Sequence, residues 1–245
     1  MLKIENLCKT FAPSNPDEKT IFNKLNFTAS KGEFITIIGG NGAGKSTLMN
    51  LISGSIFPDA GKIYIDNKDV TYMHEHKRAR FIGRVFQDPL KGTAPNLTIE
   101  ENLQLAMLRN SVKGLEFGIN KKNTELFQER LLTLNLGLEN RLKTKVGLLS
   151  GGQRQALTLL MATIVEPKIL LLDEHTAALD PKSRCNILKL TEKIANSPEM
   201  ITLMITHNMA NVLSLGNRTI MLSSGKIALD AKGDDRKKIN FNFVY

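Results

Sequence analysis

Short apolar runs that end in a polar residue or a glycine recur along the chain, and they constrain its fold more than any other feature. Each run has the length and composition of a buried strand, and helical patterns separate several of them, as in residues 46–51 and 182–195. Strands that alternate with helices predict a mainly parallel sheet with helices on its faces. The four runs are EFITIIG, RFIGRVFQ, KILLLDE and MITLMITH.

The carboxyl ends of these predicted strands carry a glycine or side chains that are able to bind a ligand. The runs end at Gly39, at Gln87, at the pair Asp173 and Glu174, and at His207. In open sheets of this kind, ligands bind outside the carboxyl ends of the strands. We therefore expect these residues to lie together along one edge of the sheet.

A glycine-rich segment, GGNGAGKST at residues 39–47, joins the first predicted strand to a predicted helix. It matches the pattern G-x-x-x-x-G-K-[ST] in the context that supports a phosphate-binding loop. The glycines let backbone N–H groups surround phosphate oxygens, and the helix that follows presents its positive end to the anion. Lys45 would place its charge near the outer phosphates, and Ser46 would offer a hydroxyl to Mg²⁺. An ordinary glycine turn with a solvated lysine is the alternative interpretation. The predicted phosphate-binding residues are Gly39, Gly40, Asn41, Gly42, Ala43, Gly44, Lys45, Ser46 and Thr47.

Two adjacent carboxylates end the third run. Asp173 closes ILLLD and is placed to hold the Mg²⁺ shell from across the site, and Glu174 is placed to polarise an attacking water. Carboxylates at strand ends are often helix caps, and that interpretation would be favoured for either residue alone. Beside a phosphate loop, the metal and base hypotheses are preferred.

A second glycine pair stands at the start of another predicted helix, in LSGGQRQ at residues 149–155. Ser150 and Gln153 have the spacing of a capping box, which explains why a helix begins there. Ordinary helix formers would serve a capping box better than Gly151 and Gly152, because glycine costs roughly 1 kcal/mol against alanine in a helix. Two glycines at a helix N-terminus suit a backbone that approaches an anion closely. The segment therefore predicts half of a second phosphate site, whose other half is elsewhere.

The rest of the chain divides into two further parts. Short alternating runs at residues 1–7, 20–29 and 62–70 predict an antiparallel sheet beside the parallel one. Apolar residues at helical spacing in IEENLQLAMLR and TELFQERLLTLNL predict a helical insertion. We expect a single domain, residues 1–245, in which residues 1–88 and 166–245 form the core and residues 89–165 form a helical subdomain.

With LSGGQRQ, the chain resembles the ABC-type ATPases, and the other elements of that family follow in order over essentially the whole chain. Residues 39–47 correspond to the Walker A loop, and residues 169–174 to Walker B with its adjoining glutamate. The resemblance implies an α/β P-loop NTPase fold, with a RecA-like mainly parallel sheet, an antiparallel β subdomain and an inserted helical subdomain that carries the signature. It also implies that the ligands are ATP and Mg²⁺.

The resemblance implies roles for four more residues, each with a structural alternative. Phe11 would stack on adenine, or it is a core aromatic. Gln87 would be the Q-loop glutamine near the metal, or it caps a turn before Pro89. Asp180 would belong to the D-loop, and before Pro181 it is also a suitable helix N-cap. His207 would be the switch histidine that contacts the γ-phosphate, or it is structural.

Family resemblance also implies how the site is completed. Two copies would pack head to tail, so that the signature of one copy faces the Walker A loop of the other with ATP between them. Glu174 would act as the base, while Lys45, Mg²⁺ and His207 stabilise charge. The implied metal ligands are Ser46, Gln87 and Asp173. The signature residues that would contact ATP are Ser150, Gly151, Gly152 and Gln153.

The expected partners follow from the same resemblance. A subunit of this kind powers a separate transmembrane permease from the cytoplasmic face of the membrane, with an extracytoplasmic solute-binding protein as a further possible partner. The segment DEHTAALDP at residues 173–181 resembles ATPases of bacterial uptake systems, which favours import of an amino-acid-like solute. His175 stands where many family members have proline, and an imidazole is able to titrate near neutrality. We assign it no catalytic role.

Composition limits the alternatives. The formal net charge is +9, but the basic residues are interleaved with acids, and with no Trp and three Tyr there is no aromatic-rich basic patch. We expect no nucleic-acid partner. No segment is apolar enough for a signal peptide or a membrane span, and Cys8 and Cys185 are expected to be free thiols. Export, lipoprotein release and nucleic-acid-associated ABC ATPases remain the competing functions.

Overall fold

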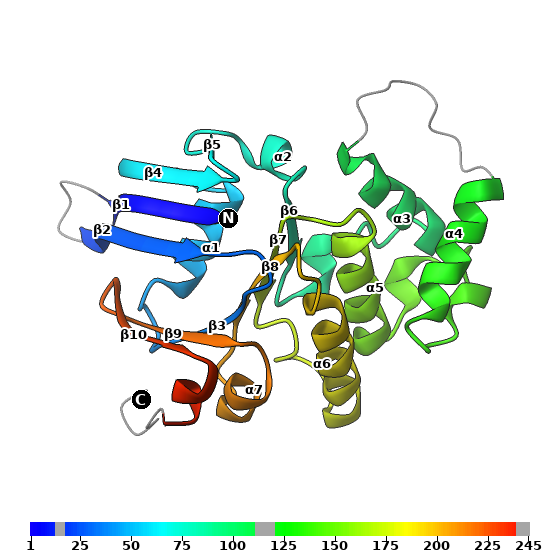
Figure 1. Cartoon of the computed structure of the whole chain (residues 1–245). Coiled ribbons are helices and arrows are strands. Elements are labelled where there is room, and N and C mark those ends of the chain that lie inside the picture. Colours follow the sequence, from blue (N-terminus) through cyan, green and yellow to red (C-terminus); the bar gives the residue numbers. More distant parts are fainter. Residues whose placement is uncertain (13–17, 111–120, 239–245) are drawn as a thin grey trace.

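The computed structural model describes residues 1–12, 18–110 and 121–238, which form two β-sheets and a group of helices beside them (Figure 1). The larger sheet has six strands in the order β10-β9-β3-β8-β7-β6. All pairs in it are parallel except β9 and β10, which are antiparallel. The strands are β3 (Phe34–Ile38), β6 (Ile82–Val85), β7 (Ile169–Asp173), β8 (Ile201–Ile205), β9 (Arg218–Ser223) and β10 (Lys226–Lys232).

The four predicted strands of the parallel sheet are confirmed. They are β3, β6, β7 and β8, and every residue of β3 and β8 is buried, as their apolar composition requires. The strands are immediate neighbours in the order β3-β8-β7-β6. Their carboxyl ends therefore lie along one edge, and the residues that follow each strand are brought to the same side of the molecule.

The hairpin of β9 and β10 was not anticipated from the sequence. Strand β9 pairs with β3 in parallel, and β10 closes the sheet at that edge. A short 3-10 helix, η5 (Gly233–Lys238), follows it. The hairpin turn packs onto the smaller sheet, because Gly225 brings its backbone against the carbonyl of Ile21.

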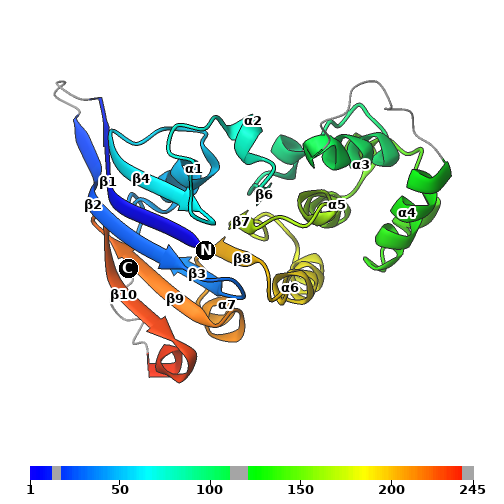
Figure 2. The same cartoon turned by 45° about the horizontal axis from the view of Figure 1, so that its top comes forward.

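The smaller sheet is antiparallel, as predicted, and has the strand order β2-β1-β4-β5. Its inner face shares one apolar core with the parallel sheet, which includes Leu2, Phe22 and Ile63 from one sheet and Ile37 and Leu203 from the other. In Figure 2, β1 and β2 run alongside β9 and β10. The strands are β1 (Leu2–Phe11), β2 (Lys19–Ala29), β4 (Ala60–Ile65) and β5 (Lys68–Asp69).

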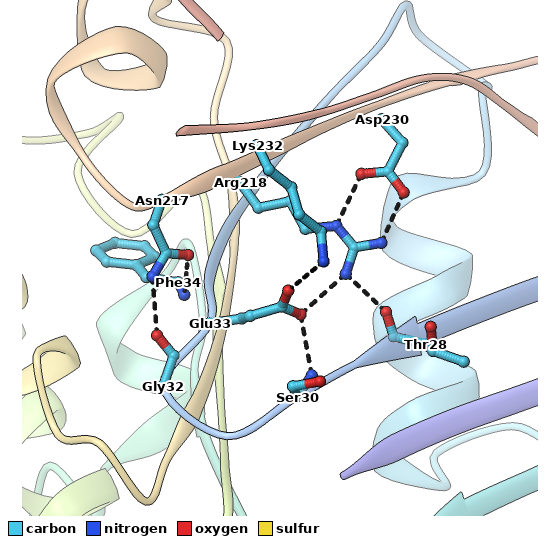
Figure 3. A network of polar contacts seen from close by, with 9 residues as sticks. All are labelled: Thr28, Ser30, Gly32, Glu33, Phe34, Asn217, Arg218, Asp230 and Lys232. Atoms are coloured by element: carbon cyan, nitrogen blue, oxygen red, sulfur yellow. Dashed lines mark hydrogen bonds and ion pairs between the residues drawn. The ribbon is translucent and has the colours of Figure 1, made fainter. Parts of the chain in front are cut away.

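A buried arginine joins the two sheets at the end away from the strands' carboxyl termini (Figure 3). Arg218 at the start of β9 contacts Asp230 of β10 at 2.6 Å and Glu33 at 2.9 Å, and donates to the carbonyl of Thr28 in β2 at 2.7 Å. Lys232 adds a second cation to Glu33. Because the guanidinium is satisfied from three elements at once, this network fixes the hairpin against both sheets.

The helices fall into two groups. Those that follow strands of the parallel sheet or connect its parts are α1 (Lys45–Ser53), α2 (Glu75–Arg78), α6 (Pro181–Ala195) and α7 (Met209–Ser214). The others lie between β6 and β7 in the chain, where a helical insertion was expected. They are η1 (Pro89–Gly92), α3 (Ile99–Met107), η2 (Leu108–Asn110), α4 (Lys121–Leu132), η3 (Leu138–Asn140), η4 (Val146–Leu148) and α5 (Gly151–Thr163).

The second group of helices has its own apolar core. Ile99 and Leu103 of α3, Phe127 of α4 and Leu157 of α5 are fully buried in it. Helix α3 begins with a capping box between Thr98 and Glu101, which satisfies two backbone donors of its first turn. The expected subdomain of residues 89–165 includes residues 111–120, and the expected core includes residues 13–17 and 239–245, which lie outside the described residues.

The helices of the described ranges are short or polar relative to the thickness of a bilayer. None of them combines the length and the apolar composition that a membrane-spanning helix needs.

Candidate functional site

The phosphate loop lies between β3 and α1, as the motif predicted. Gly44, at the N-cap of α1, has φ of 103°, and a Cβ there would lie 2.8 Å from the ring of Phe22. Gly39 has φ of 146°, and a Cβ there would collide with the carbonyl of Leu222. Only glycine meets both demands, a left-handed backbone and no side chain. Glycine is therefore required at both positions for the loop to pass between β3 and α1.

Lys45 lies at the base of this loop and is buried. Its Nζ donates to the carbonyl oxygens of Gly39 at 2.7 Å and Gly40 at 3.0 Å. Burial lowers the pKa of Lys45, and the charges of Glu174 and Asp173 partly oppose that effect. The ammonium is thus held by the loop itself, facing two carboxylates across the sheet edge.

A cavity of about 230 Å³ opens over the loop. Residues 41–47 line it together with Ile21, Glu174 and His207. His207 Nε2 lies 2.7 Å from Glu174 Oε1, so these two strand-end residues form a pair at the mouth of the cavity. The structure therefore brings the loop, the carboxylate after β7 and the histidine after β8 into one site.

Asp173 and Gln87 line a second cavity of about 430 Å³, to which Asn50 of α1 also contributes. Burial raises the pKa of Asp173, while Arg84 and Lys45 act in the opposite direction. Gln87 is exposed and does not cap the next turn, because Asp88 is the N-cap of η1 and accepts from the N–H of Leu90. The capping alternative for Gln87 is therefore wrong.

The proposed magnesium ligands fit a metal that shares its shell with phosphate. Ser46 lines the first cavity, and Gln87 and Asp173 line the second, so the three supply hydroxyl, amide and carboxylate oxygens. Oxygen donors suit Mg²⁺, which usually takes one or two carboxylates plus substrate phosphates and waters. In the part of the chain that the structure describes, no group of three or more His, Cys, Asp or Glu residues is arranged for a metal. The oxygen donors of Ser46, Gln87 and Asp173 therefore fit Mg²⁺ by their chemistry.

Arg84 is a site residue that sequence analysis missed. It lies in β6, its Nη2 is 3.9 Å from Asp173 Oδ2, and it donates to Asn50 Oδ1 at 2.7 Å and to Ser53 Oγ at 3.0 Å. Its guanidinium also stacks over the ring of Phe86, 4.6 Å from the centroid. One feature of the sequence could have indicated this role: Arg84 lies inside an otherwise buried strand, where a charged side chain needs a partner.

Helix α5 begins at the second glycine pair with the capping box that was predicted. Ser150 Oγ accepts from the N–H of Gln153, and Gln153 Oε1 accepts from the N–H of Ser150. Gly152 also has a packing role that its sequence context did not indicate. A Cβ on Gly152 would lie 2.6 Å from Ser183 Oγ and 2.8 Å from Ser183 Cβ, because α6 crosses α5 closely at this point. Gly152 is thus explained by packing within the chain, whereas a Cβ on Gly151 would meet nothing nearer than Leu179, at 3.7 Å.

This contact makes Gly152→Ala destabilising without any nucleotide. We expect it to lower the free energy of unfolding by about 1–3 kcal/mol, the usual cost of overpacking. In the double variant, Ser183→Gly should recover part of the lost stability. Urea unfolding of the wild type, the two single variants and the double variant would measure the coupling energy between positions 152 and 183. Gly151→Ala is the matched control and should be nearly neutral. Strict additivity of Gly152→Ala and Ser183→Gly would contradict the packing explanation.

The signature segment does not share a cavity with the phosphate loop of its own chain. Ser150, Gly152 and Gln153 line a separate cavity of about 500 Å³ with residues of α6. The loop cavity is lined from the parallel sheet and from β2 instead. Within the described residues, the signature segment therefore lines no part of the cavity over the loop.

The positions of Phe11 and Asp180 test the structural interpretations that were considered for them. Phe11 ends β1 and is 41% exposed, so its assignment as a core aromatic is wrong. Lys9 Nζ lies 5.5 Å from the centroid of the Phe11 ring. Asp180 is the N-cap of α6, where its Oδ1 accepts from the N–H groups of Lys182 and Ser183, which confirms the cap.

His175 is a buried, neutral histidine, and the suggestion that it titrates near neutrality is wrong. Its side chain is 2% exposed, and burial lowers the pKa of His175 to about 4. Thr191 Oγ1 donates to the carbonyl of Ile187, so it accepts the hydrogen bond from His175 Nε2 at 2.9 Å. The proton of the neutral ring is therefore on Nε2, and the residue fixes the segment after β7 against α6.

The lowered pKa makes this residue a source of acid instability. Unfolded histidine has a pKa near 6.5, so above that pH neither state binds the proton and the residue has no effect. Below it the unfolded chain takes up a proton that the folded chain refuses, and stability falls as the pH drops toward 4. The full effect is roughly 3 kcal/mol. Denaturant unfolding between pH 7 and pH 4 should show this slope in the wild type and a shallower one in His175→Asn. Parallel pH profiles of the two chains would refute it.

Comparisons with known proteins agree with this geometry. A family model described as "ABC transporter" matches residues 22–177. A tyrosine transport ATP-binding protein from Clostridioides difficile (strain R20291) is 45% identical over 240 residues, covering 98% of this chain and 95% of the relative. A putative hemin import ATP-binding protein, HrtA, from Staphylococcus haemolyticus (strain JCSC1435) is 33% identical, covering 93% of this chain and 99% of the relative.

Solved structures give the same answer for the fold. A dimeric ATP-binding cassette, MJ0796, in a post-hydrolysis state bound to ADP and Pi has a TM-score of 0.80 and 30% identity, and covers 95% of this chain and 98% of its own. A nucleotide-free ATP-binding cassette from an ABC transporter has a TM-score of 0.78 and 26% identity, and covers 97% and 93%. The α/β P-loop fold with both kinds of sheet is thus confirmed. Because the family model spans more than half of the chain and relatives align with nearly all of it, this chain belongs to the ABC transporter family, as an ATP-binding subunit that hydrolyses ATP to drive transport.

Proposed function

We propose that this ATPase drives the uptake of a small amino-acid-like solute through a permease that is a separate polypeptide. The observation that carries the proposal is the 45% identity with the tyrosine transport ATP-binding protein of C. difficile, which extends over 98% of the chain. The hemin relative is also named as an import protein. The permease and an extracytoplasmic solute-binding protein would select the cargo within this class.

In the proposed reaction, a water molecule attacks the γ-phosphorus of ATP in line with the leaving ADP. The new O–P bond forms as the bond between the γ-phosphorus and the β–γ bridging oxygen breaks, and Glu174 takes the water's proton. The 2.7 Å contact from His207 Nε2 to Glu174 Oε1 supports this role, because it orients the carboxylate and leaves Oε2 to accept the proton. Lys45 stabilises charge on the outer phosphates.

The metal ligands in this proposal are Ser46, Gln87 and Asp173. When bound, Mg²⁺ would neutralise charge that develops on the phosphate oxygens. The partly buried carboxylate of Asp173 and the exposed amide of Gln87 line one cavity, Ser46 lines another, and α1 contributes residues to both. This arrangement supports a metal held between phosphate and protein.

The rest of the nucleotide site would be shared between two copies of the chain. The exposed ring of Phe11 would carry adenine, and residues 39–47 would hold the phosphates. The N-terminus of α5, with Ser150, Gly151, Gly152 and Gln153, would close the site from the second copy, together with Asp180. The separation of the signature cavity from the loop cavity supports this division. ATP would then hold the dimer closed, and hydrolysis would release it.

The helical part of the chain would couple the site to the permease. We assign residues 1–88 and 166–245 to the ATP-binding core and residues 89–165 to a helical subdomain. Gln87 stands at their junction, between the cavity it shares with Asp173 and the start of η1. A change at the metal site would thus be transmitted to the helices, which would contact the permease at the cytoplasmic face of the membrane.

A transport assay tests the proposal directly. A strain that lacks this gene would be complemented with the wild-type chain or with Glu174→Gln, and uptake of labelled tyrosine and other amino acids would be measured. We expect the deletion to abolish uptake of at least one of these solutes and only the wild-type chain to restore it. Increased intracellular retention of the solute in the deletion strain would indicate export, and unchanged uptake of every amino acid would exclude this solute class.

A further inference from the structure

Lys19, the first residue of β2, is a cation beside the phosphate loop to which no role has been assigned. Its Nζ lies 3.3 Å from the position that a Cβ on Gly42 would occupy, so it reaches over the outside of the loop. The side chain is exposed. Within the described ranges, neither an ion pair nor a hydrogen bond engages its ammonium. A free lysine at the mouth of an anion cradle is available for a ligand.

Strand β2 contacts the loop at two points. Ile21 lines the loop cavity, and its Cγ2 lies 3.0 Å from the position of a Cβ on Gly44. Lys19 reaches Gly42, which is closer to the entrance of the loop. The absence of side chains at both glycines is what lets β2 approach so closely. Ile21 is therefore part of the wall of the loop cavity, and the ammonium of Lys19 lies beside the loop, next to that wall.

The position of Lys19 relative to Phe11 indicates which part of a nucleotide it would meet. In the ladder of β1 and β2, Phe11 lies directly opposite Lys19. Residues paired in this way have Cβ atoms about 4.5–5.5 Å apart. Lys45, in contrast, is at the base of the loop, facing Glu174 and Asp173. Lys19 therefore stands between the platform for the base and the charges that surround the outer phosphates.

We propose that Lys19 binds the α-phosphate, the phosphate nearest the base, in both ATP and ADP. The inference rests on the proposed placement of adenine on Phe11. A positive charge at this point would be equally attracted to the substrate, the product and the transition state, because the α-phosphate does not react. Lys19 is thus a binding residue that sets nucleotide affinity, whereas Lys45 acts where charge changes during hydrolysis.

Substitution of Lys19 by methionine separates these roles. In Lys19→Met the Kd for ADP and the Kd for a non-hydrolysable ATP analogue should rise by the same factor, about tenfold for one charge-assisted contact. The KM for ATP should rise similarly while kcat stays unchanged. Lys19→Arg should retain most of the affinity. Lys24→Met is the matched control. Lys24 is exposed on the same strand, and its substitution removes the same charge.

Two results would overturn the proposal. One is equal nucleotide affinity in Lys19→Met and Lys24→Met, which would show that Lys19 makes no specific contact with the nucleotide. The other is weaker binding of the ATP analogue with unchanged binding of ADP, which would place Lys19 at the γ-phosphate. The proposed placement of adenine on Phe11 has its own test. It predicts that Phe11→Ala, which keeps Lys19, binds both nucleotides more weakly. Unchanged binding in Phe11→Ala would contradict the adenine placement and not the role of Lys19.

Discussion

Glu174→Gln should still bind ATP but hydrolyse it about 100-fold to 10,000-fold more slowly, the usual contribution of a general base. The amide keeps the shape of the carboxylate and its position beside the phosphate loop, yet it does not accept a proton from water. In the wild-type chain Glu174 Oε1 is 2.7 Å from His207 Nε2, and the amide oxygen of glutamine is able to accept that same hydrogen bond. Steady-state release of phosphate at saturating Mg²⁺ and ATP would measure the loss.

The same variant should accumulate as a dimer when ATP is present, because hydrolysis no longer opens the closed dimer. Analytical ultracentrifugation with and without ATP would detect it. Glu192→Gln, which removes a carboxylate from the exposed side of α6, is the matched control and should keep wild-type turnover. A Glu174→Gln chain that stays monomeric at saturating ATP would count against the shared-nucleotide arrangement.

Arg78→Met should cause a large loss of stability at a position outside the site. Arg78 at the end of α2 is fully buried and donates to four carbonyl oxygens, those of Leu51, Ile52, Thr71 and Met73, at 2.6–2.8 Å. Burial lowers the pKa of Arg78 to about 10, so the group is still charged at neutral pH. Two of these carbonyls, those of Leu51 and Ile52, belong to the last turn of α1, where a cation also interacts favourably with the negative end of the helix dipole.

Methionine fills much of the same space but leaves those four carbonyls without a donor. Each unsatisfied buried group costs about 1–3 kcal/mol, and relaxation recovers part of the total, so we expect the free energy of unfolding to fall by about 4 kcal/mol. Urea unfolding monitored by circular dichroism would give the value. Arg80→Met, at an exposed position two residues later, should change it by less than about 0.5 kcal/mol. A similar small change in Arg78→Met would show that water satisfies the carbonyls.

Local patterns were sufficient to predict most of the architecture. The strands β3, β7 and β8 were recognisable because each is a largely apolar run, which a strand buried on both faces requires, and β6 was recognisable from the apolar residues on either side of Arg84. The loop of residues 39–47 was recognisable because its glycines and its lysine have to stand at set spacings within one turn. The capping boxes and the N-cap at Asp180 are local for the same reason, since both partners lie within one helical turn.

Features that depend on contacts between distant segments were predicted wrongly or missed. The packing role of Gly152 was missed, because its close neighbour Ser183 lies on another helix. His175 was expected to be titratable, but α6 buries it and Thr191 holds it neutral. Arg84 was not assigned a role, because its partners Asn50, Ser53 and Asp173 come from two other elements.

The sequence by itself determined the fold class, the ATP-binding family and the edge of the sheet at which the chemistry lies, because strand periodicity and motif spacing act over a few neighbouring residues. The tertiary structure alone decided which residue each side chain meets across that edge. Burial, pKa and hydrogen-bond partners depend on the distance between atoms in space, and the packing of α5 on α6 and of β2 on the phosphate loop sets those distances.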